Sequence, residues 1–166
     1  VLCRVESGCA SCSLRELCVP AGLGQAELLR LDGLIQHRRP IKRGSYVFRA
    51  GAFMRSLFAI RAGSFKTTVL HDDGREQVTG FYMAGELMGL DGISSDAHTA
   101  NAVALEDGEL CELPFDELER LVCHIPSLQH QFHRIMSREI VRDHGVMLLL
   151  GAMSAEERIA TFLLQL

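Results

Sequence analysis

Long hydrophobic runs are absent from this chain; a representative apolar run, residues 146–150, is only five residues long. A membrane-spanning helix needs about 20 consecutive apolar residues, and the N-terminal residues lack the pattern of a secretory signal. The net charge is -4, so the chain itself does not carry the basic surface typical of nucleic-acid-binding domains. We therefore expect a soluble, cytoplasmic protein with no membrane partner.

Catalytic residue sets are also missing. The sequence contains neither a nucleophile next to a base and an orienting group nor a pair of carboxylates with catalytic spacing, so we expect no enzyme activity. At 166 residues and 48% hydrophobic content, the chain is long enough to bury a core without disulfide bonds.

Cysteine is the residue type that points most clearly to a function. Cys9, Cys12 and Cys18 form a Cys-x2-Cys-x5-Cys pattern in a segment that ends at Pro20. Three thiolates in one short loop can converge on one centre, and an iron-sulfur cluster requires four cysteine ligands. No histidine lies in the loop, so the fourth ligand must come from elsewhere, and Cys111 is the candidate.

Other roles for the cysteines remain open. A structural zinc site with four cysteine ligands usually combines two Cys-x2-Cys pairs, and only one such pair occurs here, so the pattern favours iron and sulfur over zinc. Cys111 taken alone would be an ordinary buried thiol. We expect Cys123 to pack in the interior, and Cys3 lies outside the compact set. A cluster-free β-roll that binds a small molecule is a further alternative.

The periodicity of apolar residues predicts a mainly β protein with additional helices. A short helix is expected over residues 25–35, and glycine-rich turns then separate β-prone runs about every ten residues, as in a jelly roll. The predicted strands are 45–48, 56–61, 64–70, 76–83, 99–105 and 109–113, with a hairpin turn at Asp73-Gly74.

Helices are predicted for the rest of the chain. A short one covers residues 115–123, a long one runs from about Pro126 to Gly151, and a capping box from Ser154 to Glu157 starts another.

The long helix carries a seam of residues spaced by four, three, four and three positions. Its members are Met136, Ile140, Asp143, Met147 and Leu150. This spacing is typical of a coiled coil, and a second copy of the helix would give a symmetric homodimer. The two Asp143 carboxylates would then lie near one another, which opposes association. The alternative is that Asp143 reaches solvent at little cost.

Several segments together resemble the fumarate and nitrate reduction regulator (FNR), the oxygen-sensing branch of the cyclic-AMP receptor protein superfamily. They are the four cysteines, the Cys-Glu-Leu-Pro-Phe segment at 111–115, residues 41–44, 57–63 and 80–87, and residues 147–150 before 155–158. The likeness covers essentially the whole chain. It implies a cyclic-nucleotide-binding-like double-stranded β-helix, a long C-terminal dimerisation helix, and a winged helix-turn-helix DNA-binding domain beyond residue 166.

The resemblance also implies a domain organisation and a mechanism. Residues 1–22 would bind the cluster, 23–124 form the sensory β-roll, 125–152 the dimerisation helix, and 153–166 the start of the linker. Cys9, Cys12, Cys18 and Cys111 would hold a 4Fe-4S cluster that promotes dimerisation and hence DNA binding. Oxygen would convert the cluster to a 2Fe-2S form and then to apoprotein, and the dimer would dissociate.

Three further expectations concern the surroundings of the cluster, the hairpin at residues 71–77 and the nucleotide pocket. Ser13 and Leu17 lie between ligands, where side chains set hydrogen bonds to the sulfurs and the access of oxygen. The hairpin at residues 71–77 corresponds to a region that contacts RNA polymerase, although Arg75 places a positive charge there. Cyclic-AMP receptors pair the nucleotide phosphate with an arginine about ten residues after a Gly-Glu pair. Here Gly85-Glu86 is present, but no arginine lies between Arg75 and Arg120, so we expect no cyclic nucleotide.

Overall fold

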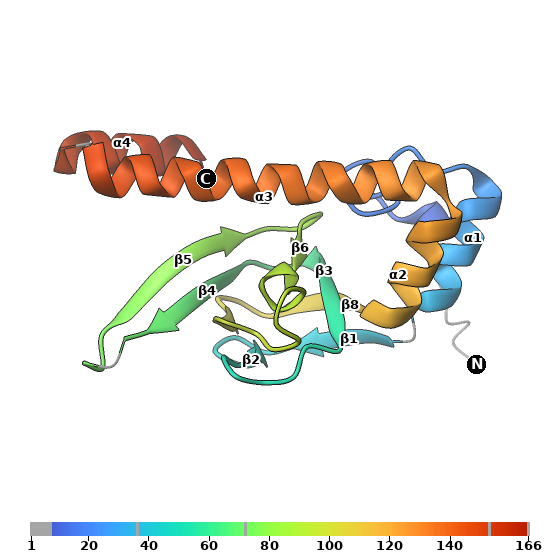
Figure 1. The fold of residues 1–166 in the computed structure, drawn as a ribbon, viewed down its shortest axis with the longest axis horizontal. Coiled ribbons are helices and arrows are strands. Elements are labelled where there is room, and N and C mark those ends of the chain that lie inside the picture. The colour runs from blue at the N-terminus through green and yellow to red at the C-terminus, as the bar shows by residue number, and fades with distance from the viewer. Residues whose placement is uncertain (1–7, 36, 72, 153, 166) are drawn as a thin grey trace. The chain divides into compact units, whose positions relative to one another are not determined.

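The structure is a computed structural model that describes residues 8–35, 37–71, 73–152 and 154–165. The chain divides into two compact units, Val1–Phe132 and His133–Leu166, and each is considered by itself. The described part of the first unit contains two β-sheets, the cysteine loop and the shorter helices (Figure 1).

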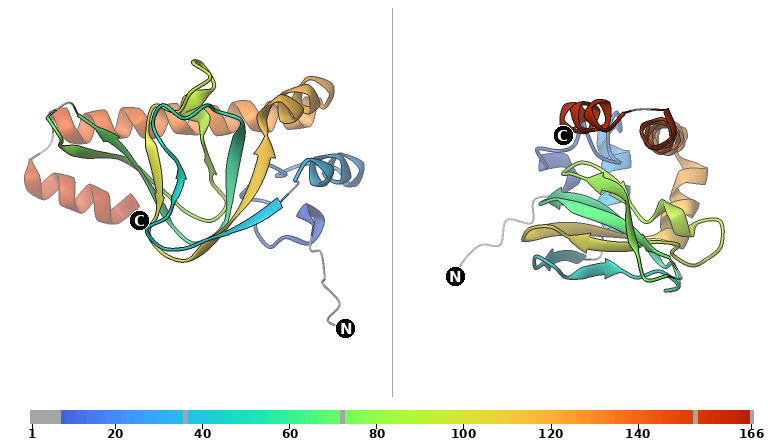
Figure 2. Two further views of the ribbon diagram at one scale, coloured as in Figure 1. Left: turned by 90° about the horizontal axis from the view of Figure 1, so that it is seen from below. Right: turned by 90° about the vertical axis from the view of Figure 1, so that its left-hand side faces the viewer.

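Two four-stranded antiparallel sheets form the β-roll. The first has the order β1-β8-β3-β6, with β1 at His37–Ile41, β8 at Gly108–Pro114, β3 at Ser56–Ala62 and β6 at Leu87–Met88. The second has the order β2-β7-β4-β5, with β2 at Tyr46–Phe48, β7 at Asn101–Ala104, β4 at Phe65–Leu70 and β5 at Glu76–Tyr82. Figure 2 shows these strands wrapping around a common interior. The predicted jelly roll is confirmed.

Apolar side chains from both sheets fill that interior. In β7, Ala102 and Ala104 are buried while Asn101 and Val103 are more exposed, which is the alternation of a strand with one face on the core. The buried core residues are Ile41, Val47, Phe48, Phe58, Ile60, Phe65, Met88, Ala102, Ala104 and Leu110. Burial of this apolar surface is the main force that holds the two sheets together.

The β4–β5 hairpin has the turn that the sequence predicts. The amide of Gly74 donates to the carbonyl of His71, and Gly74 has a φ of 83°, which glycine adopts without strain. Two strands, β1 and β6, were not predicted because their sequences lack the alternation of apolar and polar residues that marks a strand. β1 reads His-Arg-Arg-Pro-Ile, without an apolar alternation, and β6 has only two residues.

Short helices lie beside the sheets. The 3-10 turn η1 (Cys9–Ser11) and the helix α2 (Phe115–His124) both contact α1 (Gln25–Leu34). A second 3-10 turn, η2 (Leu90–Gly92), follows β6. α1 begins with a carboxylate cap, since Glu27 accepts a hydrogen bond from the amide of Gly24, which satisfies one of the free amides of the first turn. The predicted helices at 25–35 and 115–123 are confirmed to within one residue.

Two helices make up most of the rest. α3 (Pro126–Ala152) is a single helix of 27 residues, and α4 (Ala155–Gln165) follows it. The capping box at the start of α4 is confirmed: the amide of Ser154 donates to Glu157, and the amide of Glu157 donates to the Ser154 hydroxyl. None of the described helices is long and apolar enough to cross a membrane.

Candidate metal centre

The cysteine loop is built from consecutive tight turns. Backbone amides donate three or four residues back, from Cys12 to Cys9, from Arg15 to Cys12 and from Cys18 to Leu14. This winding keeps three cysteines on a short path, with a single 3-10 turn where the sequence predicts an irregular loop. The loop can therefore present several thiols to one point.

Cys111 comes from the sheet rather than from the loop. It lies on β8, between β1 and β3, where its direct neighbours are Arg38 and Ala59. Strands on both sides fix its backbone, so Cys111 is the rigid member of the set.

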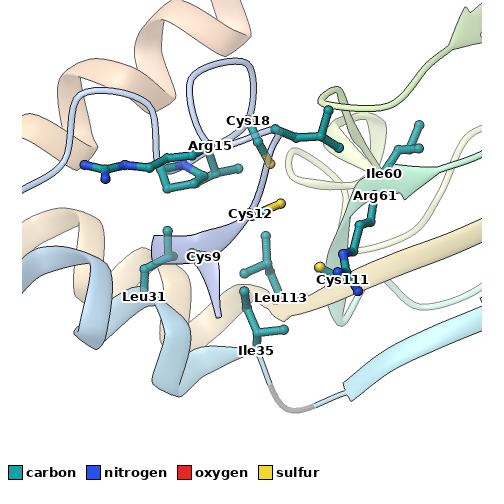
Figure 3. A pocket seen from close by; sticks show the side chains of 13 residues that line it. Cys9, Cys12, Arg15, Cys18, Leu31, Ile35, Ile60, Arg61, Cys111 and Leu113 are labelled. Carbon is teal, nitrogen blue, oxygen red and sulfur yellow. The ribbon is translucent and has the colours of Figure 1, made fainter. Parts of the chain in front are cut away.

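All four cysteines line one cavity in the first unit (Figure 3). The rest of the lining is mostly aliphatic, with two arginines, and consists of Leu14, Arg15, Val19, Pro20, Leu31, Ile35, Ile60, Arg61 and Leu113. Residues about a hundred positions apart in the sequence thus meet at one apolar site. The assignment of these four cysteines as ligands of one centre stays a prediction.

Burial favours the protonated form of three of these thiols, Cys9, Cys18 and Cys111. The pKa of Cys9 is raised from 9.0 to about 12, chiefly by burial and then by the charge of Asp32. Burial likewise raises the pKa of Cys18 to about 11. The pKa of Cys111 is also raised by burial, while Arg38 and Arg61 act in the opposite direction. A metal that binds here must therefore displace protons.

Comparison with known proteins identifies the family. The cyclic nucleotide-binding domain family matches residues 38–123. The transcriptional activator protein Anr of Pseudomonas protegens is 44% identical over 161 residues, covering 97% of this chain and 66% of that protein. The fumarate and nitrate reduction regulatory protein of Yersinia pestis is 43% identical over 171 residues, covering 100% of this chain and 68% of that protein. The chain belongs to the FNR type of the cyclic-AMP receptor protein superfamily.

Solved structures agree on the fold of this FNR-type chain. FixK2 from Bradyrhizobium japonicum superposes with a TM-score of 0.72 at 24% identity, covering 78% of this chain and 64% of that one. The FNR-type chain spans about two thirds of the length of the curated relatives that it matches.

Two side chains outside the cavity anchor the ends of the FNR-type cysteine loop. The Asp32 carboxylate on α1 accepts a hydrogen bond of 2.8 Å from the amide of Cys9. The Gln131 side chain on α3 donates one of 3.3 Å to the carbonyl of Cys18. Neither residue could be predicted from the sequence, because no motif spacing connects them to the cysteines.

The separation of the thiols bears on which metal fits. Among the described residues, no three His, Cys, Asp or Glu side chains lie close enough to hold one metal ion. Tetrahedral zinc with Zn–S bonds of 2.3 Å would need sulfurs about 3.8 Å apart. A four-iron cluster binds each cysteine at a different iron, so its ligands stand farther apart. The four cysteines share the lining of one cavity, and which metal group they hold stays a prediction.

The remaining cysteine and tuning positions lie outside the cavity lining. Cys123 is exposed, so the prediction that it packs in the interior is wrong: it occupies the solvent side of α2. Cys3 falls outside the described residues. Ser13 is exposed, and Leu17 is 62% exposed. Leu17 nevertheless packs closely on Gly85, where an added Cβ would lie 2.9 Å from the Leu17 Cβ.

The predicted seam of α3 carries exposed apolar side chains. Met136 is 38% exposed, Ile140 55% and Met147 67%, and Asp143 is exposed among them. The Leu150 side chain falls outside the described residues.

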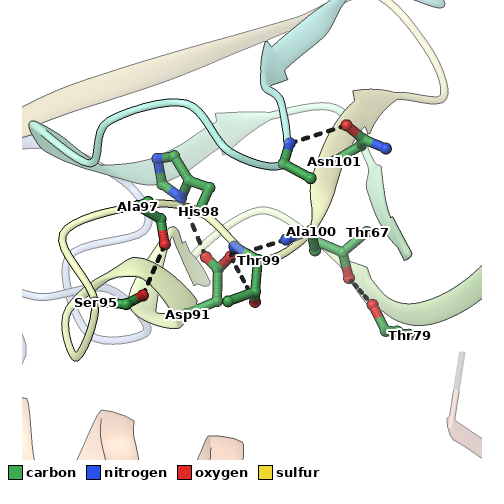
Figure 4. A network of polar contacts seen from close by, with 10 residues as sticks. Thr67, Thr79, Asp91, Ser95, Ala97, His98, Thr99, Ala100 and Asn101 are labelled. Carbon is green, nitrogen blue, oxygen red and sulfur yellow. Dashed lines mark hydrogen bonds and ion pairs between the residues drawn. The ribbon is translucent and has the colours of Figure 1, made fainter. Parts of the chain in front are cut away.

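A carboxylate holds together the segment after Gly85-Glu86 (Figure 4). Asp91 accepts hydrogen bonds from the amides of Thr99 and Ala100, at 2.7 and 3.2 Å, and lies 3.2 Å from the ring of buried His98. The His98 ring in turn stacks on Phe48. These amides are therefore already occupied by an anion, which would repel a nucleotide phosphate.

Proposed function

We propose that this chain is the oxygen-sensing and dimerisation portion of an FNR-type transcription regulator, with a 4Fe-4S cluster held by Cys9, Cys12, Cys18 and Cys111. The observation that carries the proposal is that these cysteines, three from a loop and one from a strand, line one apolar cavity. When bound, the cluster supplies an oxygen-sensitive connection between the loop and the sheet.

Different residues of the chain would contribute to cluster binding in different ways. Cys111 lies on a strand that pairs with a neighbouring strand on each side, so its backbone position is fixed. The cysteine loop must therefore approach Cys111 for the four thiolates to bind one cluster. Burial raises the pKa of Cys111, and the charges of Arg38 and Arg61 partly offset that rise in favour of the thiolate, which is the form that binds iron. The aliphatic lining supports the proposal because it keeps water away from the sulfurs and so slows unwanted hydrolysis and exchange.

Loss of the cluster would release the loop from the sheet. Without metal the raised pKa values of Cys9 and Cys18 favour neutral thiols, which neither attract one another nor fix the loop. The loop would then depend on its hydrogen bonds to Asp32 and Gln131. A cluster that binds only when the loop and the sheet are held together would favour that conformation, and its loss would shift the population toward conformations in which the loop is released.

A second copy of the chain is the partner that we propose for the exposed seam of α3. Met136, Ile140 and Met147 supply apolar surface, whereas Asp143 opposes association. When monomer and dimer are of similar stability, a change of a few kcal/mol in the free energy of association converts most of one form into the other. DNA, through a helix-turn-helix domain, and RNA polymerase are the further partners proposed for the whole regulator. In the β4–β5 turn that we compare with a polymerase contact, Arg75 already pairs with Asp73.

A matched pair of cysteine variants tests the assignment. The chain is purified without air, and iron and acid-labile sulfide are counted for Cys111→Ser and for Cys123→Ser. We expect Cys123→Ser to bind about four irons per chain, because that thiol is exposed and outside the cavity, and Cys111→Ser to lose most of them. Equal cluster content in the two variants would refute the ligand set. One tightly bound zinc and no sulfide would favour the zinc alternative, and a colourless, metal-free protein the cluster-free β-roll.

A further inference from the structure

The first turns of α3 contact the cysteine loop directly. Gln131 is only 5% exposed, and its side-chain amide donates to the backbone carbonyl of Cys18 over 3.3 Å. The carbonyl belongs to one of the proposed cluster ligands, while the donor belongs to the proposed dimerisation helix. A buried polar side chain of this kind is retained only where it finds a partner.

A second contact ties the same end of α3 to the other end of the loop. The Ser127 hydroxyl donates to Glu27 on α1 over 2.8 Å. α1 also carries Asp32, which accepts from the amide of Cys9. The start of α3 is therefore connected to Cys18 directly and to Cys9 through α1. Of these connections, only Gln131 joins the helix to a ligand residue without an intermediate element.

The seam begins on the same continuous helix. Met136 follows Gln131 by five residues, and α3 has no break between them, so the two positions are about 7.5 Å apart along the axis. A hydrogen-bonded helix moves as a rigid element over such a distance. A change in the position of the Cys18 carbonyl would thus bias the placement of the seam.

We infer that Gln131 is a positioning residue that couples cluster occupancy to dimerisation, by holding α3 to Cys18 while the thiolate of Cys18 is bound to iron. The inference rests on the proposed function and adds the route by which the loop acts on the helix. When Cys18 is released from iron, its carbonyl is no longer fixed relative to the sheet, so the hydrogen bond to Gln131 holds α3 less firmly.

Substitution of Gln131 removes the coupling without leaving a buried group unpaired. The Cys18 carbonyl also accepts from the amide of Ala21 at 3.1 Å, so it retains a partner in Gln131→Met. Methionine has a similar length and no donor, and it fills space in an apolar interior. The matched control is Gln129→Met, because Gln129 lies on the same helix but is exposed.

The test is a comparison of dimer dissociation constants. Each protein is prepared without air, its iron and sulfide are counted, and its dimer dissociation constant is measured by sedimentation before and after exposure to air. The ratio of the two constants expresses the coupling. In Gln131→Met we expect the ratio to fall about tenfold relative to wild type, as the loss of one hydrogen bond in each protomer implies. Cluster content should be unchanged.

The control variant and a second measurement distinguish failure of the Gln131 coupling from failure of the proposed function. Gln129→Met should keep the wild-type ratio, and equal ratios for Gln131→Met and wild type would overturn the inference while leaving the proposed function intact. A wild-type chain that holds no cluster, or whose dimer ignores air, would overturn both. If Gln131→Met does not fold, hydrogen exchange of residues 126–136 in the wild-type protein replaces it: exchange should rise when the cluster is lost, and unchanged exchange would refute the coupling.

Discussion

The contact between Asp32 and Cys9 gives the sharpest prediction about the loop itself. The Asp32 carboxylate accepts from the Cys9 amide at 2.8 Å, in partly buried surroundings. A hydrogen bond to a charged group contributes about 1.5–3 kcal/mol. Asp32→Ala should therefore make local opening at Cys9 easier by a factor of about ten or more. Asp32→Asn keeps an acceptor oxygen, so its effect should be smaller.

The assay is amide hydrogen exchange in the metal-free, reduced chain. Exchange at Cys9 reports the local opening free energy, and the amide of Leu28, bonded to Gly24 within α1, serves as an internal reference. Gly8→Ala is an independent perturbation, because a Cβ at Gly8 would overlap the Asp32 carboxylate and push it away. If protection at Cys9 is the same in wild type and Asp32→Ala, the structural role given to Asp32 is incorrect.

Three more measurements probe other parts of the molecule. Asp143→Ala should favour the dimer by about 1–2 kcal/mol through loss of like-charge repulsion, seen by sedimentation of the metal-free chain; no change would mean that the Asp143 carboxylates lie apart. Gly85→Ala should lower the free energy of unfolding by roughly 1–3 kcal/mol, because Gly85 has a φ of 96° and packs on Leu17; urea unfolding checks this, and full stability would argue against the contact. The metal-free chain should also lose stability as the pH rises from 9 toward 11. In that window the unfolded thiols ionise while native Cys9 and Cys18, with pKa values of about 12 and 11, keep their protons, so the native state binds more protons. Unfolding of Cys9→Ser should depend less on pH, and an identical dependence would contradict the shift.

Sequence patterns predicted the architecture because they express local physics. Glycine turns at regular intervals and the Asp73-Gly74 pair located most of the strands, and the capping box at Ser154 located the start of α4. β1 was missed because two arginines and a proline hide its pairing with β8, which depends on a partner about seventy residues away.

Some residues of the candidate site could likewise be predicted from the sequence, and others could not. The cysteine spacing predicted Cys9, Cys12 and Cys18 as ligands with Cys111 as the candidate for the fourth, and all four line one cavity. The roles of Asp32 and Gln131 could not be predicted from the sequence, because their contacts to Cys9 and Cys18 depend on how α1 and the start of α3 pack beside the loop. Cys123 was expected inside because free cysteine is usually buried, yet the helix phase of α2 places it in solvent.

The central claim is that a cluster on Cys9, Cys12, Cys18 and Cys111 controls association of two chains. The most direct test is sedimentation of one anaerobic sample before and after air, with iron and sulfide counted at both points. The account predicts about four irons per chain in a dimer, and a monomer once the iron is lost. A chain that keeps the same mass while its iron disappears would contradict it.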